Sequence, residues 1–271
     1  MCTLALAWQV FPDAPVVVAA NRDEALDRPA DPPGRFADDP RVVAPRDRDA
    51  GGTWIGINER DVLVAITNRW TDATLAGERS RGLLVADALS RRTASAAATA
   101  VDSACASDEY GGFYLVIADA SDAYVLGWNG RLDRRQLDPG VHVVTNVGPV
   151  DAPVLPSSRV GPARKQLDQG RRVRDALGSE VDGGSDSADT GSESAPRTSD
   201  RGDRSAGDVD AWLDRAEAVL SDHAYGVCRH GDGFGTRSSS LIALGERPHY
   251  RYAPGPPCRT AFEPVDLESH I

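Results

Sequence analysis

Lysine is nearly absent from this chain of 271 residues: Lys165 is the single one, and arginine supplies the remaining basic side chains. Acidic residues number 41 against 30 basic ones, which gives a formal net charge of -11. Because nucleic-acid binding depends on patches of lysine and arginine, this balance argues against a nucleic-acid partner. Acidic, lysine-poor chains with few aromatics are typical of halophilic organisms, in which surface charge maintains solubility when salt screens ordinary repulsion.

Long apolar runs are missing as well. No stretch approaches the roughly 18 consecutive apolar residues of a membrane span. No basic segment precedes the first apolar run, so a secretory signal is not expected. The sequence therefore predicts a cytoplasmic protein with no membrane span.

Cysteine is scarce and dispersed, and none of the four cysteines, Cys2, Cys105, Cys228 and Cys258, belongs to a CxxC pair. This spacing argues against zinc-ribbon and thioredoxin-like sites, and the low density argues against a disulfide framework. We expect no metal and no organic cofactor. Cys105 lies in an alanine-rich stretch and is interpreted as a core residue.

Hydrophobic residues make up 41% of the chain, enough for a substantial core, and their spacing predicts the elements. Strands are predicted over residues 2–9, 15–21, 51–57, 61–68, 111–120, 123–130, 142–146, 237–245 and 249–255. Helices are predicted over residues 80–104, with a break near Arg91, and over 161–177 and 208–224. This order predicts one α+β domain, residues 1–271, in which helices cover stacked sheets.

The segment from Gly178 to Asp208 differs in composition from its surroundings. It is rich in Gly, Ser and Asp and nearly free of large apolar side chains. Such a segment cannot bury enough surface to offset the entropy lost on ordering. We predict a disordered insertion within the domain.

Cys2 is the first candidate for chemistry. It alternates with Leu4, Leu6 and Trp8, the period-two spacing of a strand. If Met1 is removed, as we expect, the chain begins with a cysteine whose α-amine can serve as the base for its own thiol. A hairpin with the next strand would return "NRDE", residues 21–24, toward that end of the chain.

Within "NRDE", Asp23 can hold the α-amine, and Arg22 can bind a substrate carboxylate or pair with an acid. A solvated turn is the alternative interpretation. Three predicted strands end in asparagine, at Asn21, Asn68 and Asn146. Asparagine commonly terminates strands, but carboxamides gathered at one sheet edge can also stabilise a developing oxyanion.

The ordered set "MCTLALA", "NRDE", "GGTWIGINERDVLVAITNRW", "VVTN" and "GTRSSS" resembles the NRDE family, the transport and Golgi organisation protein 2-like group. The resemblance covers nearly the whole chain except the insertion. The family is similar to N-terminal-nucleophile (Ntn) hydrolases, which include bile-salt hydrolases and penicillin V acylases. The resemblance therefore implies a four-layer αββα sandwich.

The resemblance also implies roles for individual residues. Cys2 matches the nucleophile and Asp23 the aspartate of those enzymes, while Asn68 and Asn146 match their two strand-end asparagines. The arginine that precedes the aspartate in the acylases is replaced by Ala20. Substrate binding is assigned instead to a set of three arginines, Arg22, Arg159 and Arg237.

Two further side-chain arrangements leave alternatives open. Arg237 enters an apolar strand and needs a partner, for which Asp23 or Glu24 is a candidate; a structural ion pair is equally compatible. Cys228 and His230 can form a thiol–imidazole pair on one face of a short strand, or serve in packing.

The sequence thus predicts an Ntn-type cysteine hydrolase or acyltransferase that acts on an amide or thioester of a small molecule. The alternative is a binding protein of the same fold that carries acyl-CoA, lipid or haem-like ligands without turnover. A redox-sensing thiol is a third possibility, but it needs a resolving cysteine. The substrate and the oligomeric state are not predicted.

Overall fold

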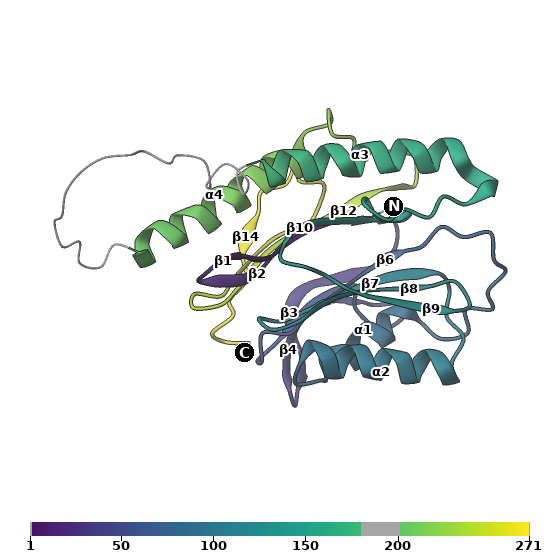
Figure 1. Ribbon diagram of the computed structural model, residues 1–271, viewed down its shortest axis with the longest axis horizontal. Helices are drawn as coiled ribbons and strands as arrows, with labels where there is room; N and C mark the ends of the chain where they lie inside the picture. Colours follow the sequence, from purple (N-terminus) through teal and green to yellow (C-terminus); the bar gives the residue numbers. More distant parts are fainter. Residues whose placement is uncertain (1, 180–200, 271) are drawn as a thin grey trace.

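The computed structural model describes residues 2–179 and 201–270, which form four stacked layers (Figure 1). Two seven-stranded antiparallel sheets face each other. Helices α3 (Val160–Gly178) and α4 (Arg201–Ser221) cover the outer face of one sheet, and α1 (Arg81–Leu89) and α2 (Ala94–Ser107) cover the other. The predicted αββα sandwich is confirmed.

The first sheet contains the first and last strands of the chain and has the strand order β11-β10-β1-β2-β12-β13-β14. Its strands are β1 (Thr3–Phe11), β2 (Ala14–Ala25), β10 (Gly140–Thr145), β11 (Gly148–Pro149), β12 (Phe234–Leu244), β13 (His249–Ala253) and β14 (Glu263–Pro264). β1 is therefore a central strand between β2 and β10. Residues at its start are flanked by strands on both sides.

The second sheet follows the chain order from β3 to β9. Its strands are β3 (Ala30–Asp38), β4 (Arg41–Asp47), β5 (Ile55–Asn58), β6 (Leu63–Asn68), β7 (Phe113–Ala118), β8 (Ala123–Trp128) and β9 (Leu132–Gln136). β3, β4 and β9 are not predicted from the sequence. β3 contains Pro32 and Pro33, which a strand tolerates only where it lacks a second neighbour, and β3 is an edge strand.

Alternation along β1 divides the core. Leu4 and Leu6 pack between the two sheets, whereas Ala5 and Ala7 pack in the cluster beneath α3 and α4. Burying a leucine side chain fully is worth roughly 2 kcal/mol, so this pattern fixes which face of β1 meets the second sheet. A side chain at position 2 has the same parity as Leu4 and Leu6.

The predicted helical stretch over residues 80–104 is confirmed as two helices with a break between them. Ser80 caps α1 through a bond to the Gly82 amide, and Thr93 caps α2 through a bond to the Ala96 amide. Side-chain caps of this kind satisfy amides that lack a partner within the helix. The short break between the two helices therefore ends at Thr93, the N-cap of α2.

The predicted insertion falls mostly on residues 180–200, which lie outside the described residues. The backbone of residues 201–208, which the sequence analysis assigns to the insertion, belongs to α4. This helix therefore begins earlier than its apolar spacing predicts. Among the helices described here, none has the length and apolar character needed to cross a bilayer.

Candidate active site

Strand pairing brings Cys2 to the meeting point of three strands. Thr3 pairs with Asn21 of β2, and Leu4 pairs with Val144 of β10. Cys2, one residue before Thr3, therefore lies beside Arg22 and next to the end of β10. The thiol lines a small void of about 20 Å³ between the sheets.

Asn146 holds the backbone nitrogen of Cys2. Its Oδ1 accepts a hydrogen bond of 3.1 Å from the Cys2 nitrogen and another of 2.9 Å from Gln166 Nε2 of α3. Its Nδ2 donates to the backbone carbonyl of Asn68. Two donors at the oxygen and one acceptor at the nitrogen fix the orientation of this fully buried amide.

The same asparagine joins the two sheets. Asn146 follows β10 in the first sheet, and Asn68 ends β6 in the second. The amide of Trp70 also donates to the Asn146 carbonyl at 2.9 Å. Cys2 is thus held at a point where the ends of both sheets are bonded to each other.

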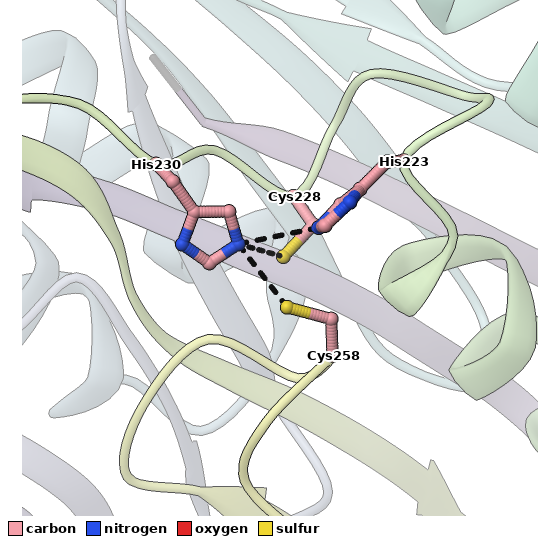
Figure 2. Close-up of side chains that lie close together, drawn as sticks. All are labelled: His223, Cys228, His230 and Cys258. Carbon is pink, nitrogen blue, oxygen red and sulfur yellow. Dashed lines mark hydrogen bonds between the residues drawn. The ribbon is translucent and has the colours of Figure 1, made fainter.

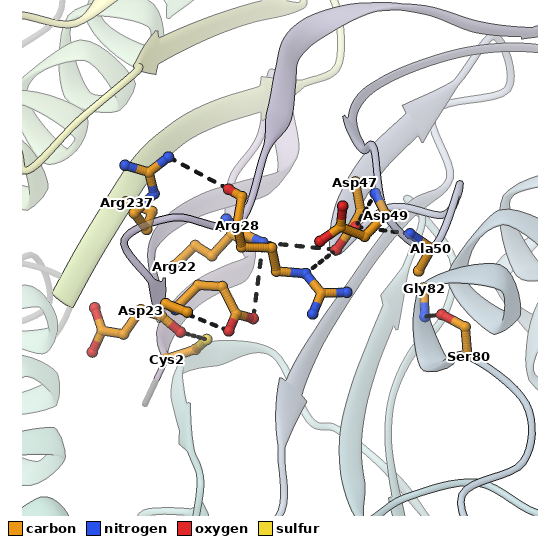
Figure 3. Close-up of polar contacts among 12 residues, drawn as sticks. Cys2, Arg22, Asp23, Arg28, Asp47, Asp49, Ala50, Ser80, Gly82 and Arg237 are labelled. Atoms are coloured by element: carbon orange, nitrogen blue, oxygen red, sulfur yellow. Dashed lines mark hydrogen bonds and ion pairs between the residues drawn. The ribbon is translucent and has the colours of Figure 1, made fainter. Parts of the chain in front are cut away.

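The Cys2 thiol lies 3.8 Å from the carbonyl oxygen of Asp23 (Figure 3). Burial raises the pKa of this thiol, and the Asp23 carboxylate adds to the rise, whereas the Arg22 cation opposes it. The net rise means that the thiol needs a nearby base to become a thiolate near neutral pH.

Asp23 is brought next to Cys2, as the hairpin prediction requires, but its carboxylate and the thiol point in different directions (Figure 3). The carboxylate accepts a 2.7 Å bond from Thr236 Oγ1 and lies 3.6 Å from Arg229 Nε. Burial raises the pKa of Asp23 to about 6, although the Thr236 hydroxyl and the Arg229 cation both oppose the rise. Asp23 therefore titrates close to neutral pH.

Arg22 faces the space between the sheets and lines the void beside Cys2. Its guanidinium lies 4.0 Å over the Trp54 ring and 3.8 Å from carboxylate oxygens of both Glu24 and Asp47. Arg28 pairs with Asp47 on the same side (Figure 3). Arg22 is therefore paired with acids, one of the two roles expected for it.

A larger cleft of about 470 Å³ adjoins this void, since Arg22, Trp54 and Ile66 line both. Asn68 and Arg81 are also among the residues that line the cleft. Arg81 donates to the Gly112 carbonyl at 2.8 Å, which holds its guanidinium at the cleft wall. The cleft can therefore hold a much larger molecule than the void at the thiol can.

The remaining predicted residues lie elsewhere or act differently. Asn21 is inside β2 rather than at its end, and its amide bonds the Leu220 and Val227 carbonyls, which ties α4 to the sheet. Arg159 lies 5.1 Å over the Trp70 ring and is not among the residues that line either cavity beside Cys2. The "NRDE" segment is part of a strand, not a turn.

The structure corrects the ion pair that the sequence predicts between Arg237 and Asp23 or Glu24. Arg237 Nη2 donates to the Arg28 carbonyl at 3.5 Å, whereas Asp23 is bonded by Thr236 and Arg229. The reason is an irregularity in β12 between Thr236 and Ser238, opposite Asp23 and Arg22 of β2. This bulge turns residue 237 away from the position that simple alternation predicts.

Sequence reasoning misses three residues that shape the site, namely Gln166, Arg229 and Thr236. Gln166 is recognisable in retrospect, because it is a polar residue on the apolar face of α3 between Ala163 and Leu167. Arg229 stands between Cys228 and His230, in a loop rather than the predicted strand. No local pattern points to Arg229.

Residues 1–253 match the model of the family described as Transport and Golgi organisation 2. The transport and Golgi organization protein 2 homolog of Bos taurus is 33% identical over 139 residues, 48% of this chain and 50% of that protein. The Homo sapiens homolog is 31% identical over 146 residues. The match thus spans about half the length of these relatives.

Solved structures share the fold at low sequence identity. Penicillin V acylase from Agrobacterium tumefaciens has a TM-score of 0.52 and 14% identity, over 97% of this chain and 84% of that one. A C2A mutant of conjugated bile acid hydrolase from Clostridium perfringens has a TM-score of 0.54 and 12% identity, over 100% and 94%. The four-layer sandwich is therefore that of Ntn hydrolases, and the chain belongs to the Transport and Golgi organisation 2 family.

Proposed function

We propose that this protein is an Ntn-type cysteine hydrolase or acyltransferase, in which Cys2 attacks the carbonyl of an amide or thioester. The observation that carries the proposal is the bond from the Cys2 nitrogen to Asn146 Oδ1, beside a thiol that lines a void between the sheets. Removal of Met1 would convert this nitrogen into an α-amine with its acceptor already in place.

The α-amine supplies the base that the raised pKa of the thiol demands. Its reference pKa of about 8 suits proton transfer near neutral pH. The amine takes the thiol proton, and the thiolate adds to the substrate carbonyl carbon. Collapse of the adduct breaks the C–N or C–S bond, and the leaving group takes the proton from the ammonium. The product is an acyl thioester on Cys2 Sγ, which water or another acceptor then cleaves.

The two asparagines differ in the roles available to them. Asn146 positions the amine through Oδ1, and its Nδ2 already donates to the Asn68 carbonyl. Asn68 is among the residues that line the cleft beside the void at Cys2, so we assign the predicted oxyanion donor to Asn68 and a positioning role to Asn146. No metal or organic cofactor is required by this mechanism.

The cleft suggests the class of substrate. Arg81 is held at its wall, and Arg22 lies between the cleft and the void at the thiol. Arginine binds carboxylate and phosphate groups through paired N–H donors. We propose a small-molecule substrate whose acyl group enters the void while an anionic group remains in the cleft.

The test follows the intact mass of the protein over time with activated acyl donors. Wild type and the control Cys105→Ala, whose cysteine lies in α2, should gain one acyl group, and Cys2→Ala should gain none. Asn68→Ala should slow the gain by about 100- to 1000-fold while ligand affinity is preserved. Equal labelling of wild type and Asn68→Ala would remove the oxyanion assignment. If no acyl donor produces acyl-Cys2, the proposal that this protein is an enzyme is wrong.

One observation favours the carrier of acyl-CoA, lipid or haem-like ligands. The void at the thiol is about 20 Å³, whereas the adjoining cleft is about 470 Å³, so the larger space for a ligand lies away from Cys2. A carrier would retain ligand binding in Cys2→Ala and never form a thioester. Calorimetry on Cys2→Ala, beside the mass assay, separates the two functions.

A further inference from the structure

Four metal-ligating side chains converge outside the site described above. They are His223, Cys228, His230 and Cys258, and their ligand atoms all lie within 4.8 Å of one another (Figure 2). Three come from the loop between α4 and β12, and Cys258 comes from the segment that follows β13. Cys228 is buried, while His223 is exposed. The cluster thus joins two segments that are distant along the chain.

A single hydrogen bond at His230 Nε2 does not account for this convergence. His230 Nε2 lies 3.2 Å from His223 Nε2, 3.1 Å from Cys258 Sγ and 3.7 Å from Cys228 Sγ. A neutral imidazole nitrogen carries either one proton or one lone pair, so it can serve one strong partner. Three heteroatoms around one nitrogen therefore need another explanation, and a shared cation at the centre provides it.

The separations fit a tetrahedral zinc ion. With Zn–N near 2.0 Å and Zn–S near 2.3 Å, a tetrahedron places two nitrogens about 3.3 Å apart and a nitrogen and a sulfur about 3.5 Å apart. The observed 3.2 Å between the imidazole nitrogens is close to the first value, and the 3.1 and 3.7 Å between nitrogen and sulfur lie on either side of the second. Two cysteines and two histidines are also a donor set that selects zinc among common divalent metals.

We propose that His223, Cys228, His230 and Cys258 bind one structural zinc ion. Four protein ligands close the coordination sphere and leave no position for substrate, which distinguishes this site from a catalytic zinc. Two thiolates balance the charge of the divalent ion. The proposal does not depend on the function assigned to Cys2.

The site acts on its surroundings through Arg229, which stands between two ligands. Arg229 Nε lies 3.6 Å from Asp23 Oδ2, and Arg229 Nη2 donates to Gln169 Oε1 at 3.2 Å. Coordination of both neighbours would fix the backbone that carries this guanidinium. Zinc would thereby hold the loop against the strand that contains Asp23.

The ligand spacing explains why the sequence analysis expects no metal. The first three ligands follow the pattern H-x4-C-x-H, and the fourth is 28 residues farther along, so no CxxC pair is present. The tertiary fold, through the return of the chain after β13, brings Cys258 to the other three. A disulfide between Cys228 and Cys258 is the rival interpretation, because both cysteines are free and adjacent here.

The test measures metal in the full chain, purified under reducing conditions from zinc-supplemented cultures and passed through gel filtration. Elemental analysis should find about one zinc ion per chain, and cobalt substitution should give the absorption of a tetrahedral thiolate site. A strong chelator should lower the melting temperature, and added zinc should restore it. Zinc far below one per chain, another stoichiometric metal, or a Cys228–Cys258 disulfide in the mass spectrum would overturn the proposal.

Matched variants test which residues bind the zinc ion. Cys258→Ser and His230→Asn should lose the zinc, whereas Cys105→Ser and His249→Asn, whose side chains lie outside the cluster, should retain it. Full zinc content in Cys258→Ser would contradict the assignment. If the ligand variants fail to fold, the metal content and cobalt spectrum of the wild-type protein decide the matter.

Discussion

Replacing Asp23 with asparagine should make the protein more stable at alkaline pH. In the folded protein the pKa of this carboxyl is raised from its ordinary value of 3.8 to about 6, mainly by burial. A raised pKa means that the folded state binds the proton more tightly than the unfolded state. The ionised carboxylate therefore costs stability, and the cost grows as the pH rises through the window from about 4 to about 6.

The size of the effect follows from the same shift. A rise from 3.8 to about 6 corresponds to a cost of about 3 kcal/mol above pH 7, which vanishes below pH 4. Asparagine is neutral at every pH and keeps an oxygen that can accept the Thr236 hydroxyl. The variant should therefore gain about 3 kcal/mol relative to wild type between pH 4 and pH 8.

Urea unfolding of both proteins at a series of pH values measures this difference. The slope with pH is the relevant quantity, because the exchange of a carboxylate for an amide also adds a constant offset. Asp168→Asn, an exposed position on α3, controls for the overall surface charge. A difference that is flat with pH, or that increasingly favours wild type at high pH, would refute the reasoning and show that the favourable contacts of the carboxylate offset or outweigh burial.

Three other substitutions test the contacts around Cys2. Asn146→Leu removes the acceptor of the Cys2 nitrogen and the bond between the sheets, and should cost about 2–4 kcal/mol in urea unfolding because buried groups lose their partners. Gln166→Met removes one donor to Asn146 Oδ1 and should cost about 1 kcal/mol, with slower acylation of Cys2 in the mass assay. Thr236→Val removes a bond that lowers the pKa of Asp23, so the loss of stability on ionisation of Asp23 should extend to higher pH in urea unfolding.

Much of the fold could be predicted because its signals are local. Alternation in the first strands and the break near Arg91 depend on neighbouring residues, and the structure confirms both. The edge strand β3 could not be recognised, since Pro32 and Pro33 argue against a strand unless its position in the sheet is already known. Its neighbour β4 is not predicted from the sequence either.

The contacts of the candidate site also fall into local ones, which the sequence predicts, and distant ones, which it does not. The proximity of Cys2 and Asp23 follows from one hairpin, which the sequence specifies through its turn and its alternation. The bond between Asn146 and Asn68 depends on how two sheets stack, and the contact between Asp23 and Arg229 depends on a loop of irregular backbone. Such contacts join residues 78 or more positions apart, and no sequence period encodes them.

The alternation of β2 has an evolutionary consequence. Arg22 faces the thiol and the cleft, while Asn21 and Asp23, on either side of it, face α4 and the loop that carries Arg229. A single inserted or deleted residue earlier in this strand would exchange the two faces and place Asp23 in the cleft. The segment can therefore diverge by substitution, but its length from the β1–β2 turn to Glu24 is fixed. Descendants of this chain should accommodate insertions in loops more readily than within that strand.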